Sequence, residues 1–128
     1  MSHLLRLVAE HEAAHAVVAA TCGAHVHQVW VNARGEGRTI HSGTGSDRDA
    51  AAITAAGDVW NRHLGTVPYR DLACLDLKTF EREHGLRKLW HANQVARRIL
   101  AAERQLVLDL ADRLINEGAI VFQDQPAA

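Results

Sequence analysis

Residues 2–23 read SHLLRLVAEHEAAHAVVAATCG, and this stretch predicts the helix around which the rest of the chain is arranged. Its Ala, Leu and Glu residues favour a helix, Ser2 is suited to cap its first turn, and Gly23 is suited to end it. Apolar positions recur every three or four residues, as on the buried side of a helix. The expected buried stripe consists of Leu4, Val8, His11, His15, Val18 and Cys22. Two histidines therefore occupy a seam that is otherwise apolar.

These two histidines belong to the sequence HEAAH at residues 11–15, which is an HExxH motif. Residues four apart lie on the same face of a helix, so both imidazoles can reach one Zn²⁺ ion. Glu12, beside the first ligand, can act as a general base toward a water molecule. A shared metal would also satisfy two polar side chains that are otherwise costly to bury. The motif therefore predicts a zinc site at His11 and His15 with Glu12 as its catalytic residue.

Length and composition point to one globular domain. The chain has 128 residues, of which 48% are hydrophobic and 23% charged, and this predicts a single domain over 1–122 with a flexible tail at 123–128. A formal net charge of −1 argues against nucleic acid or an anionic membrane as a partner. No apolar run is long enough to cross a bilayer, and no signal peptide is evident. Cys22 and Cys74 form no CxxC pair, which favours the reducing cytoplasm.

After Gly23 the pattern changes to alternation of apolar and polar residues, which predicts a small β-hairpin at 24–33 and 38–42. Three helices are expected after it, at 50–64, 69–84 and 86–117. The last is long for a globular helix, which indicates either a break near 101–104 or a contact in an oligomer. The expected fold class is α+β, mainly α. It comprises the HExxH helix, a small hairpin or sheet, and three helices including a long C-terminal one.

The third metal ligand is not given by the HExxH motif itself. The extended form HExxHxxGxxH is absent, because Val18 and Thr21 stand where Gly and His are needed. A glutamate ligand would have to come from later helices, but none there has a recognisable motif context. The glutamates in question are Glu81, Glu83, Glu103 and Glu117. An aspartate is therefore expected.

The stretch AEHEAAHAVVAATCGAHVHQVWVNARG, residues 9–35, resembles the peptidase domain of the FtsH family, peptidase family M41. In that family, HEAGHA is followed by a small-residue helix, a Gly and a strand of the form VHxVxIxPRG. Residues 55–65, AAGDVWNRHLG, are similar to its GGRAAEExxFG helix, and residues 96–120 are similar to its final helix. Ala14 replaces the usual Gly, and the paired acidic residues of the middle helix are absent. No AAA+ ATPase module or membrane anchor accompanies the motif, so a free-standing peptidase domain is expected.

The resemblance implies that the third ligand is an Asp at the start of a helix. Asp71, in the context YRDL, is favoured because it falls in the first turn after Pro68. Asp76, in the context CLDL, is the alternative, and it would lie in the middle of a helix. Further candidates for the site are Asp58, as a carboxylate that orients a ligating imidazole, together with His41 and Tyr69.

These residues and the resemblance predict a zinc metalloendopeptidase that cleaves flexible or unfolded protein without ATP. The expected partners are a peptide or unfolded protein, with a homo-oligomer or a separate partner protein as further possibilities. The substrate is expected to add as a strand along 26–33. Two alternatives stay open: a zinc-binding module that has lost catalysis, and a helical interaction or regulatory module.

Overall fold

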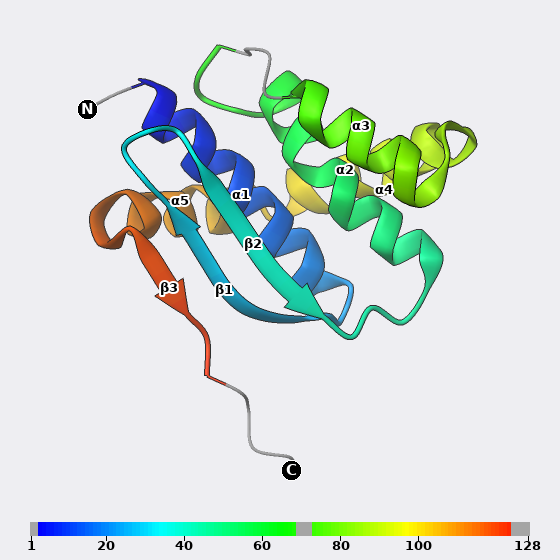
Figure 1. The fold of residues 1–128 in the computed structure, drawn as a ribbon, viewed down its shortest axis with the longest axis horizontal. Helices are drawn as coiled ribbons and strands as arrows, with labels where there is room; N and C mark the ends of the chain where they lie inside the picture. The colour runs from blue at the N-terminus through cyan, green and yellow to red at the C-terminus, as the bar shows by residue number, and fades with distance from the viewer. Residues whose placement is uncertain (1–2, 69–72, 124–128) are drawn as a thin grey trace.

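The computed structural model describes residues 3–68 and 73–123, with the backbone alone at 73–76. The fold is α+β and mainly α, as the sequence predicts (Figure 1). In chain order its elements are α1 (His3–Thr21), β1 (His25–Val31), β2 (Gly37–Ser42), α2 (Asp47–His63), α3 (Ala73–His84), a 3₁₀ turn (Leu86–Lys88), α4 (Leu89–Ala102), α5 (Arg104–Glu117) and β3 (Ala119–Val121).

Helix α1 is the central element and contacts α2, α4, α5 and both strands of the hairpin (Figure 1). From Leu7 to Ala19 every residue except His15 is buried, because the helices and the sheet together surround α1. The expected one-sided stripe is therefore too narrow a description. Leu4, which the stripe places inside, is 43% exposed. The many alanines of α1 allow this enclosure, since small side chains let neighbouring backbones approach closely.

The sheet has three antiparallel strands in the order β2-β1-β3. The predicted hairpin is confirmed, with Val29 opposite Thr39 and a bulge between Val26 and Gln28. The third strand, β3, was not expected, and it pairs Ile120 with Val29 on the other side of β1. Strand β1 is thus central with both edges paired, so the expected addition of a substrate along 26–33 is wrong. Within the hairpin, the strand with an unpaired edge is β2.

Helix α2 begins at Asp47, three residues before the predicted start. Ser46 caps it, because the Ser46 side chain accepts a hydrogen bond from the Asp49 main-chain N–H at 3.1 Å. The buried face of α2 includes Ile53, Gly57 and Trp60 and packs on α1. This packing brings the middle of α2 next to the HExxH motif.

The predicted break in the C-terminal helix is confirmed at Glu103, whose backbone leaves the helical region (φ −107°, ψ 25°). The break lets the two halves pack on different partners, α4 on α2 and α5 on α1. Leu106, an apolar residue of α5, is 52% exposed. Within the described part of the chain, no helix is long and apolar enough to cross a membrane.

Candidate metal and catalytic site

The two histidines of the motif face each other across one turn of α1. His11 Nε2 lies 3.2 Å from His15 Nε2, and the ring centroids are 4.8 Å apart with an interplanar angle of 81°. In a tetrahedral site with Zn–N bonds of about 2.0–2.1 Å, two nitrogen ligands are about 3.3 Å apart. The spacing of the two nitrogens therefore fits a shared zinc ion without movement of either ring.

The remaining ring nitrogens are held by oxygens from helix α2. His15 Nδ1 lies 2.7 Å from the Ile53 main-chain oxygen, which can only accept, so His15 Nδ1 carries the proton. His11 Nδ1 lies 2.5 Å from Asn61 Oδ1, which is also an acceptor. Both Nε2 atoms then point lone pairs at the space between them. Hydrogen bonds of this kind fix the tautomer and the orientation of metal-ligating histidines.

Gly57 on α2 makes room for this pair. A Cβ atom at position 57 would lie 2.5 Å from His11 Nε2 and 2.6 Å from His15 Nε2, closer than real Cβ contacts come. The glycine backbone is therefore in close contact with both imidazoles. Any residue larger than glycine at position 57 would displace the two imidazoles and fill the space beside their Nε2 atoms.

Glu12 is buried and its carboxylate is oriented by strand β2. Thr39 Oγ1 lies 2.9 Å from Glu12 Oε1 and 2.9 Å from the Glu12 main-chain oxygen, and its single proton can go to either acceptor. Gly37 allows this approach, because a Cβ there would lie 2.9 Å from Glu12 Cγ. The sheet thus fixes the side chain that the motif predicts to be the general base.

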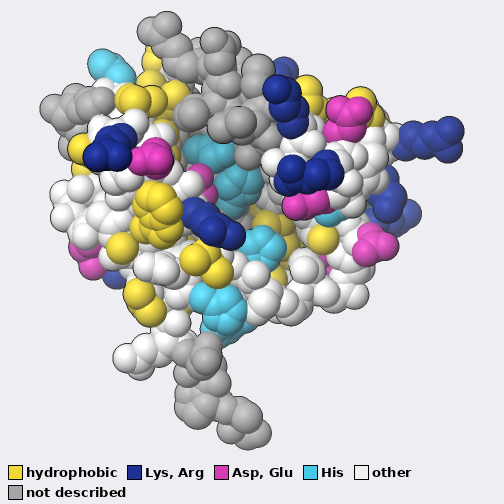
Figure 2. Space-filling view, in the orientation of Figure 1, with side chains coloured by type: hydrophobic (Ala, Val, Ile, Leu, Met, Phe, Trp, Pro, Cys, Tyr) yellow, Lys and Arg dark blue, Asp and Glu magenta, His cyan; other side chains and the backbone are white. Residues whose placement is uncertain are grey.

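A cleft of about 440 Å³ opens beside these residues, between β2 and helices α2 and α3. Figure 2 shows histidine side chains in this hollow and along the hairpin. Glu12 and His15 line the cleft together with Gly37, Arg38, Thr39, His41, Ile53, Thr54, Thr79 and Glu83. Most of these side chains are polar, so the cleft can hydrogen-bond a polar chain such as a peptide backbone.

His41, a weaker candidate from the sequence, does line this cleft. Burial lowers the pKa of His41 below its ordinary value of 6.5, the charges of His15 and His27 lower it further, and Glu83 acts in the opposite direction. His41 is therefore neutral at pH 7. Its buried Nδ1 has no hydrogen-bond partner within the described residues.

The expected third ligand is not among the residues that can be placed. Asp71 and Tyr69 lie outside the described residues, and so does the side chain of Asp76. Within the described residues, no group of three His, Cys, Asp or Glu side chains is close enough to hold a metal ion. Asp58, expected as a carboxylate that orients an imidazole, pairs with Arg62 at 3.0 Å. The oxygen that contacts His11 Nδ1 within the described residues is that of Asn61.

Asn61, Gly57 and Ile53 were missed as site residues by reading the sequence. All three come from α2, and nothing in their local sequence marks them as partners of a motif 38 to 50 residues earlier. Only position 61 offered a clue to a site residue on α2, because Asn61 lies near the place where the M41 family has paired acidic residues. A buried polar residue in an otherwise small-residue helix calls for a hydrogen-bond partner.

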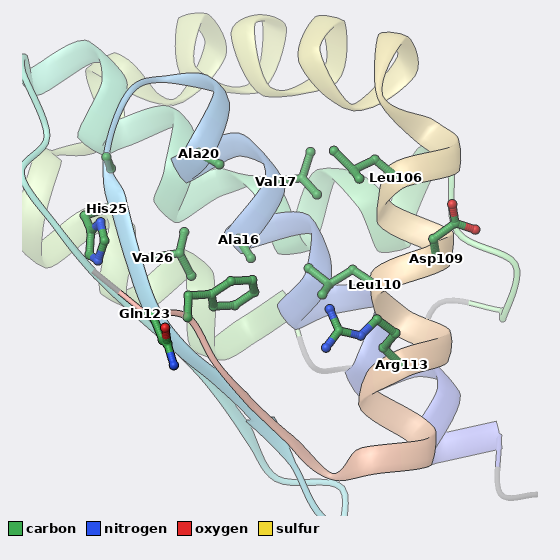
Figure 3. A pocket seen from close by; sticks show the side chains of 12 residues that line it. Ala16, Val17, Ala20, His25, Val26, Leu106, Asp109, Leu110, Arg113 and Gln123 are labelled. Atoms are coloured by element: carbon green, nitrogen blue, oxygen red, sulfur yellow. The ribbon is translucent and has the colours of Figure 1, made fainter. Parts of the chain in front are cut away.

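A larger cavity, of about 570 Å³, lies on the opposite side of α1 (Figure 3). Ala16, Val17 and Ala20 line it from α1, and Leu106 and Leu110 line it from α5. None of the motif residues reaches it, since Ala16 and Ala20 point away from His11 and His15 around the helix. Its size alone gives it no chemistry, and the smaller cleft is the candidate active site.

Comparison with known proteins identifies a family for the N-terminal half of the chain. The family model described as peptidase M50B-like matches residues 3–66, which is half of the 128-residue chain. The match spans α1, the hairpin and α2, and thus His11, Glu12, His15 and the α2 residues that contact them. No curated protein matches the chain. Most of the residues that carry the M41 resemblance lie within residues 3–66, and the family model that matches these residues is M50B-like and not M41. The metallopeptidase-like character is supported, whereas the expected M41 assignment is replaced.

Proposed function

Because the chain belongs to the peptidase M50B-like family, we propose that it is a zinc-dependent metalloendopeptidase that cleaves flexible or unfolded protein segments without ATP. One observation carries the proposal above all others. The Nε2 atoms of His11 and His15 lie 3.2 Å apart, and oxygens of α2 hold the Nδ1 atoms of both rings. The buried Glu12 directly follows His11 in the chain. This arrangement suits a cation held between the two nitrogens.

His11 and His15 would hold the metal through Nε2. We propose Asp71 as the third ligand, with Asp76 as the alternative, because each lies at or just before α3, whose residues Thr79 and Glu83 line the cleft. Zinc is the usual metal of this kind of family. When bound, it supplies a Lewis acid that polarises the scissile carbonyl and lowers the pKa of the attacking water.

Glu12 would act as the general base. Its carboxylate takes a proton from the attacking water and later gives that proton to the leaving amine nitrogen. Thr39 keeps Glu12 Oε1 in a defined position, so the carboxylate does not have to be ordered when substrate arrives. His41, neutral and facing the same cleft, would hydrogen-bond the substrate backbone.

The substrate would be an extended polypeptide lying along strand β2. That strand is at the edge of the sheet, and four of its residues line the cleft. An edge strand presents unpaired main-chain N–H and C=O groups to which an extended peptide can add. Folded proteins cannot offer such a segment, so the substrates would be flexible or unfolded regions, or proteins presented by a separate partner in the cytoplasm.

Zinc content and peptide cleavage test the proposal together. We expect about one zinc per chain, and loss of that zinc in His11→Ala and His15→Ala but not in His63→Ala, an exposed histidine of α2. Glu12→Gln should keep the zinc and lower the rate of cleavage of a labelled unfolded protein by about 10²- to 10⁴-fold. Asp71→Asn and Asp76→Asn, measured side by side, would identify the third ligand by its loss of zinc.

The same measurements separate the alternatives. A chain that takes up no zinc under zinc-replete conditions would contradict the proposal. Zinc binding without any cleavage would instead favour a zinc-binding module that has lost catalysis. Cleavage that survives in Glu12→Gln would show that this carboxylate is not the general base.

A further inference from the structure

A second concave site lies between the first turn of α2 and the start of α4. It is a hollow of about 270 Å³, which we call the basic pocket. The residues that line it are Arg48, Ala51, Arg87, Lys88, His91 and Ala92. The two alanines are buried and small, which leaves space between the longer side chains. Figure 2 shows Lys and Arg side chains at the edge of the molecule where the turn between α3 and α4 lies in Figure 1.

The cations of the basic pocket have no carboxylate partner in the part of the chain that the structure describes. Within residues 3–68 and 73–123, no ion pair engages Arg48, Arg87 or Lys88. Several other arginines are paired with carboxylates, namely Arg6, Arg62, Arg82 and Arg113. The acidic residues nearest in sequence, Asp47 and Asp49, do not line the pocket, and Asp49 interacts with the Cys22 thiol.

The position of the pocket adds further positive potential. Lys88 immediately precedes α4, His91 lies in its first turn, and the N-terminal end of a 14-residue helix carries a partial positive charge. Positive groups that line the same hollow repel one another, and an anion bound between them would relieve that repulsion. In a chain whose net charge is −1, this concentration of unpaired positive charge is a local feature and not a general excess.

The size and charge of the basic pocket favour a compact anion. Pockets that enclose drug-sized ligands start at roughly 300 Å³, so a hollow of about 270 Å³ suits one small group. Guanidinium groups bind phosphate in a bidentate manner, and a phosphate monoester carries about −1.5 to −2 charge at pH 7, more than one carboxylate. In the sequence, Leu86 precedes Arg87 and Trp90 precedes His91, and these two apolar residues are 50% and 73% exposed.

We propose that the basic pocket binds a phosphoryl group, with Arg48, Arg87 and Lys88 as its cationic ligands and His91 as a hydrogen-bond donor. The group could be borne by a small phosphate ester or by a phosphorylated polypeptide. Either source would dock through the same phosphate oxygens. The site lies outside the cleft of Glu12 and His15, shares no lining residue with it, and does not depend on the proposed peptidase activity.

An NMR titration of the full chain with inorganic phosphate tests this site. We expect a saturable movement of the main-chain amide signals of residues 48–51 and 87–92, absent when chloride replaces phosphate at the same ionic strength. Arg87→Gln and Lys88→Gln should each weaken phosphate binding by about tenfold, as expected for loss of a charge-assisted hydrogen bond. Arg97→Gln and Arg98→Gln are matched controls, because both are exposed cationic residues of the adjoining helix α4 that do not line the pocket.

The source of the phosphoryl group is distinguished by comparing a nucleoside monophosphate with a phosphoserine peptide and its unphosphorylated form. Tighter binding of either phosphorylated compound than of inorganic phosphate supports the site and identifies the source. The proposal is overturned if chloride produces the same movements, if the Arg97 and Arg98 variants weaken binding as much as the pocket variants, or if no signal moves at tens of millimolar phosphate.

Discussion

Asn61 on α2 forms a hydrogen bond with His11, the first histidine of the HExxH motif. Its Oδ1 atom lies 2.5 Å from His11 Nδ1, and Asn61 is 5% exposed, so water cannot replace it. A histidine ligand whose second nitrogen is held in this way donates more strongly to a metal and does not have to be ordered on binding. The role of Asn61 is therefore to position His11, and it follows from a contact between residues 50 positions apart.

Replacing Asn61 should weaken metal binding without removing a ligand. We expect Asn61→Leu to lower zinc affinity by about 10- to 100-fold, because His11 Nδ1 loses its acceptor. Asn61→Asp keeps an acceptor oxygen and should retain most of the affinity. Competition with a chromophoric chelator measures both variants, and equal zinc affinity in Asn61→Leu and the unchanged chain would contradict this role.

Gly57 offers a second test at the level of one residue. An alanine there would place Cβ 2.4 Å from His11 Cε1, so one or both rings must move apart. Gly57→Ala should therefore lower zinc affinity at least as much as loss of a supporting hydrogen bond, by about 10-fold or more. Gly45→Ala is the control, since a Cβ at position 45 meets nothing within 4 Å. An unchanged affinity in Gly57→Ala would show that the pair tolerates displacement.

At the scale of elements, the carboxylate of Glu10 ties α1 to three other parts of the chain. It accepts hydrogen bonds from Trp60 Nε1 and the Thr66 main-chain N–H, each at 2.9 Å, from the Thr66 hydroxyl, and from Arg6 Nε at 2.7 Å. Arg6 in turn pairs with Asp112 on α5. Burial alone would raise the pKa of Glu10, but the hydrogen bonds from Thr66, Trp60 and Arg6 outweigh it and lower the pKa below 4.5.

This network predicts a pH-dependent stability. A carboxylate whose pKa is lower in the folded chain than in the unfolded chain stabilises the fold above the unfolded value, and that stability is lost as the pH falls through the folded value. Glu10→Gln should thus lower the free energy of unfolding by about 2–3 kcal/mol at neutral pH. The difference from the unchanged chain should shrink well below pH 4.5.

Denaturant unfolding at neutral and acidic pH measures this difference. Asp112→Asn is the matched control, because the Asp112 side chain is 59% exposed and such exposed ion pairs contribute about 0–1 kcal/mol. A difference between Glu10→Gln and the unchanged chain that stays constant with pH would show that the ionised carboxylate is not the stabilising form.

For the whole molecule, metal binding and folding should be coupled, since the two proposed histidine ligands come from α1 and the oxygens that hold their Nδ1 atoms come from α2. A ligand that binds only the folded chain stabilises it by about 2.7 kcal/mol at a concentration one hundred times its dissociation constant. For a domain of this size, such a gain raises the Tm by roughly 10 °C. We expect zinc to raise the Tm by this order, a chelator to reverse the shift, and His15→Ala to abolish it. A Tm in the unchanged chain that does not respond to zinc would contradict the coupling.

The elements themselves could be predicted well from local patterns. The HExxH helix, the hairpin and the break near Glu103 all depend on residues close together in sequence, where periodicity, glycines and helix length carry the information. Burial was harder to predict than the elements themselves, as one residue of α1 and one residue of α5 show. Leu4 and Leu106 are apolar residues in helical stripes, but they are 43% and 52% exposed, because burial depends on how distant elements pack and not on local spacing alone.

What the amino-acid sequence alone specifies is the chemistry on one turn of one helix: His11 and His15 share a face because their spacing matches the helical repeat, and Glu12 lies next to His11 in the chain. The packing of α2 on α1 decides what holds those groups in place, through Asn61, Ile53 and the missing Cβ of Gly57. Strand β3 decides that β1 is central and leaves the cleft beside the edge strand β2. These features arise from contacts between distant segments, which local spacing does not encode, and they convert a pair of histidines into a site with a defined geometry.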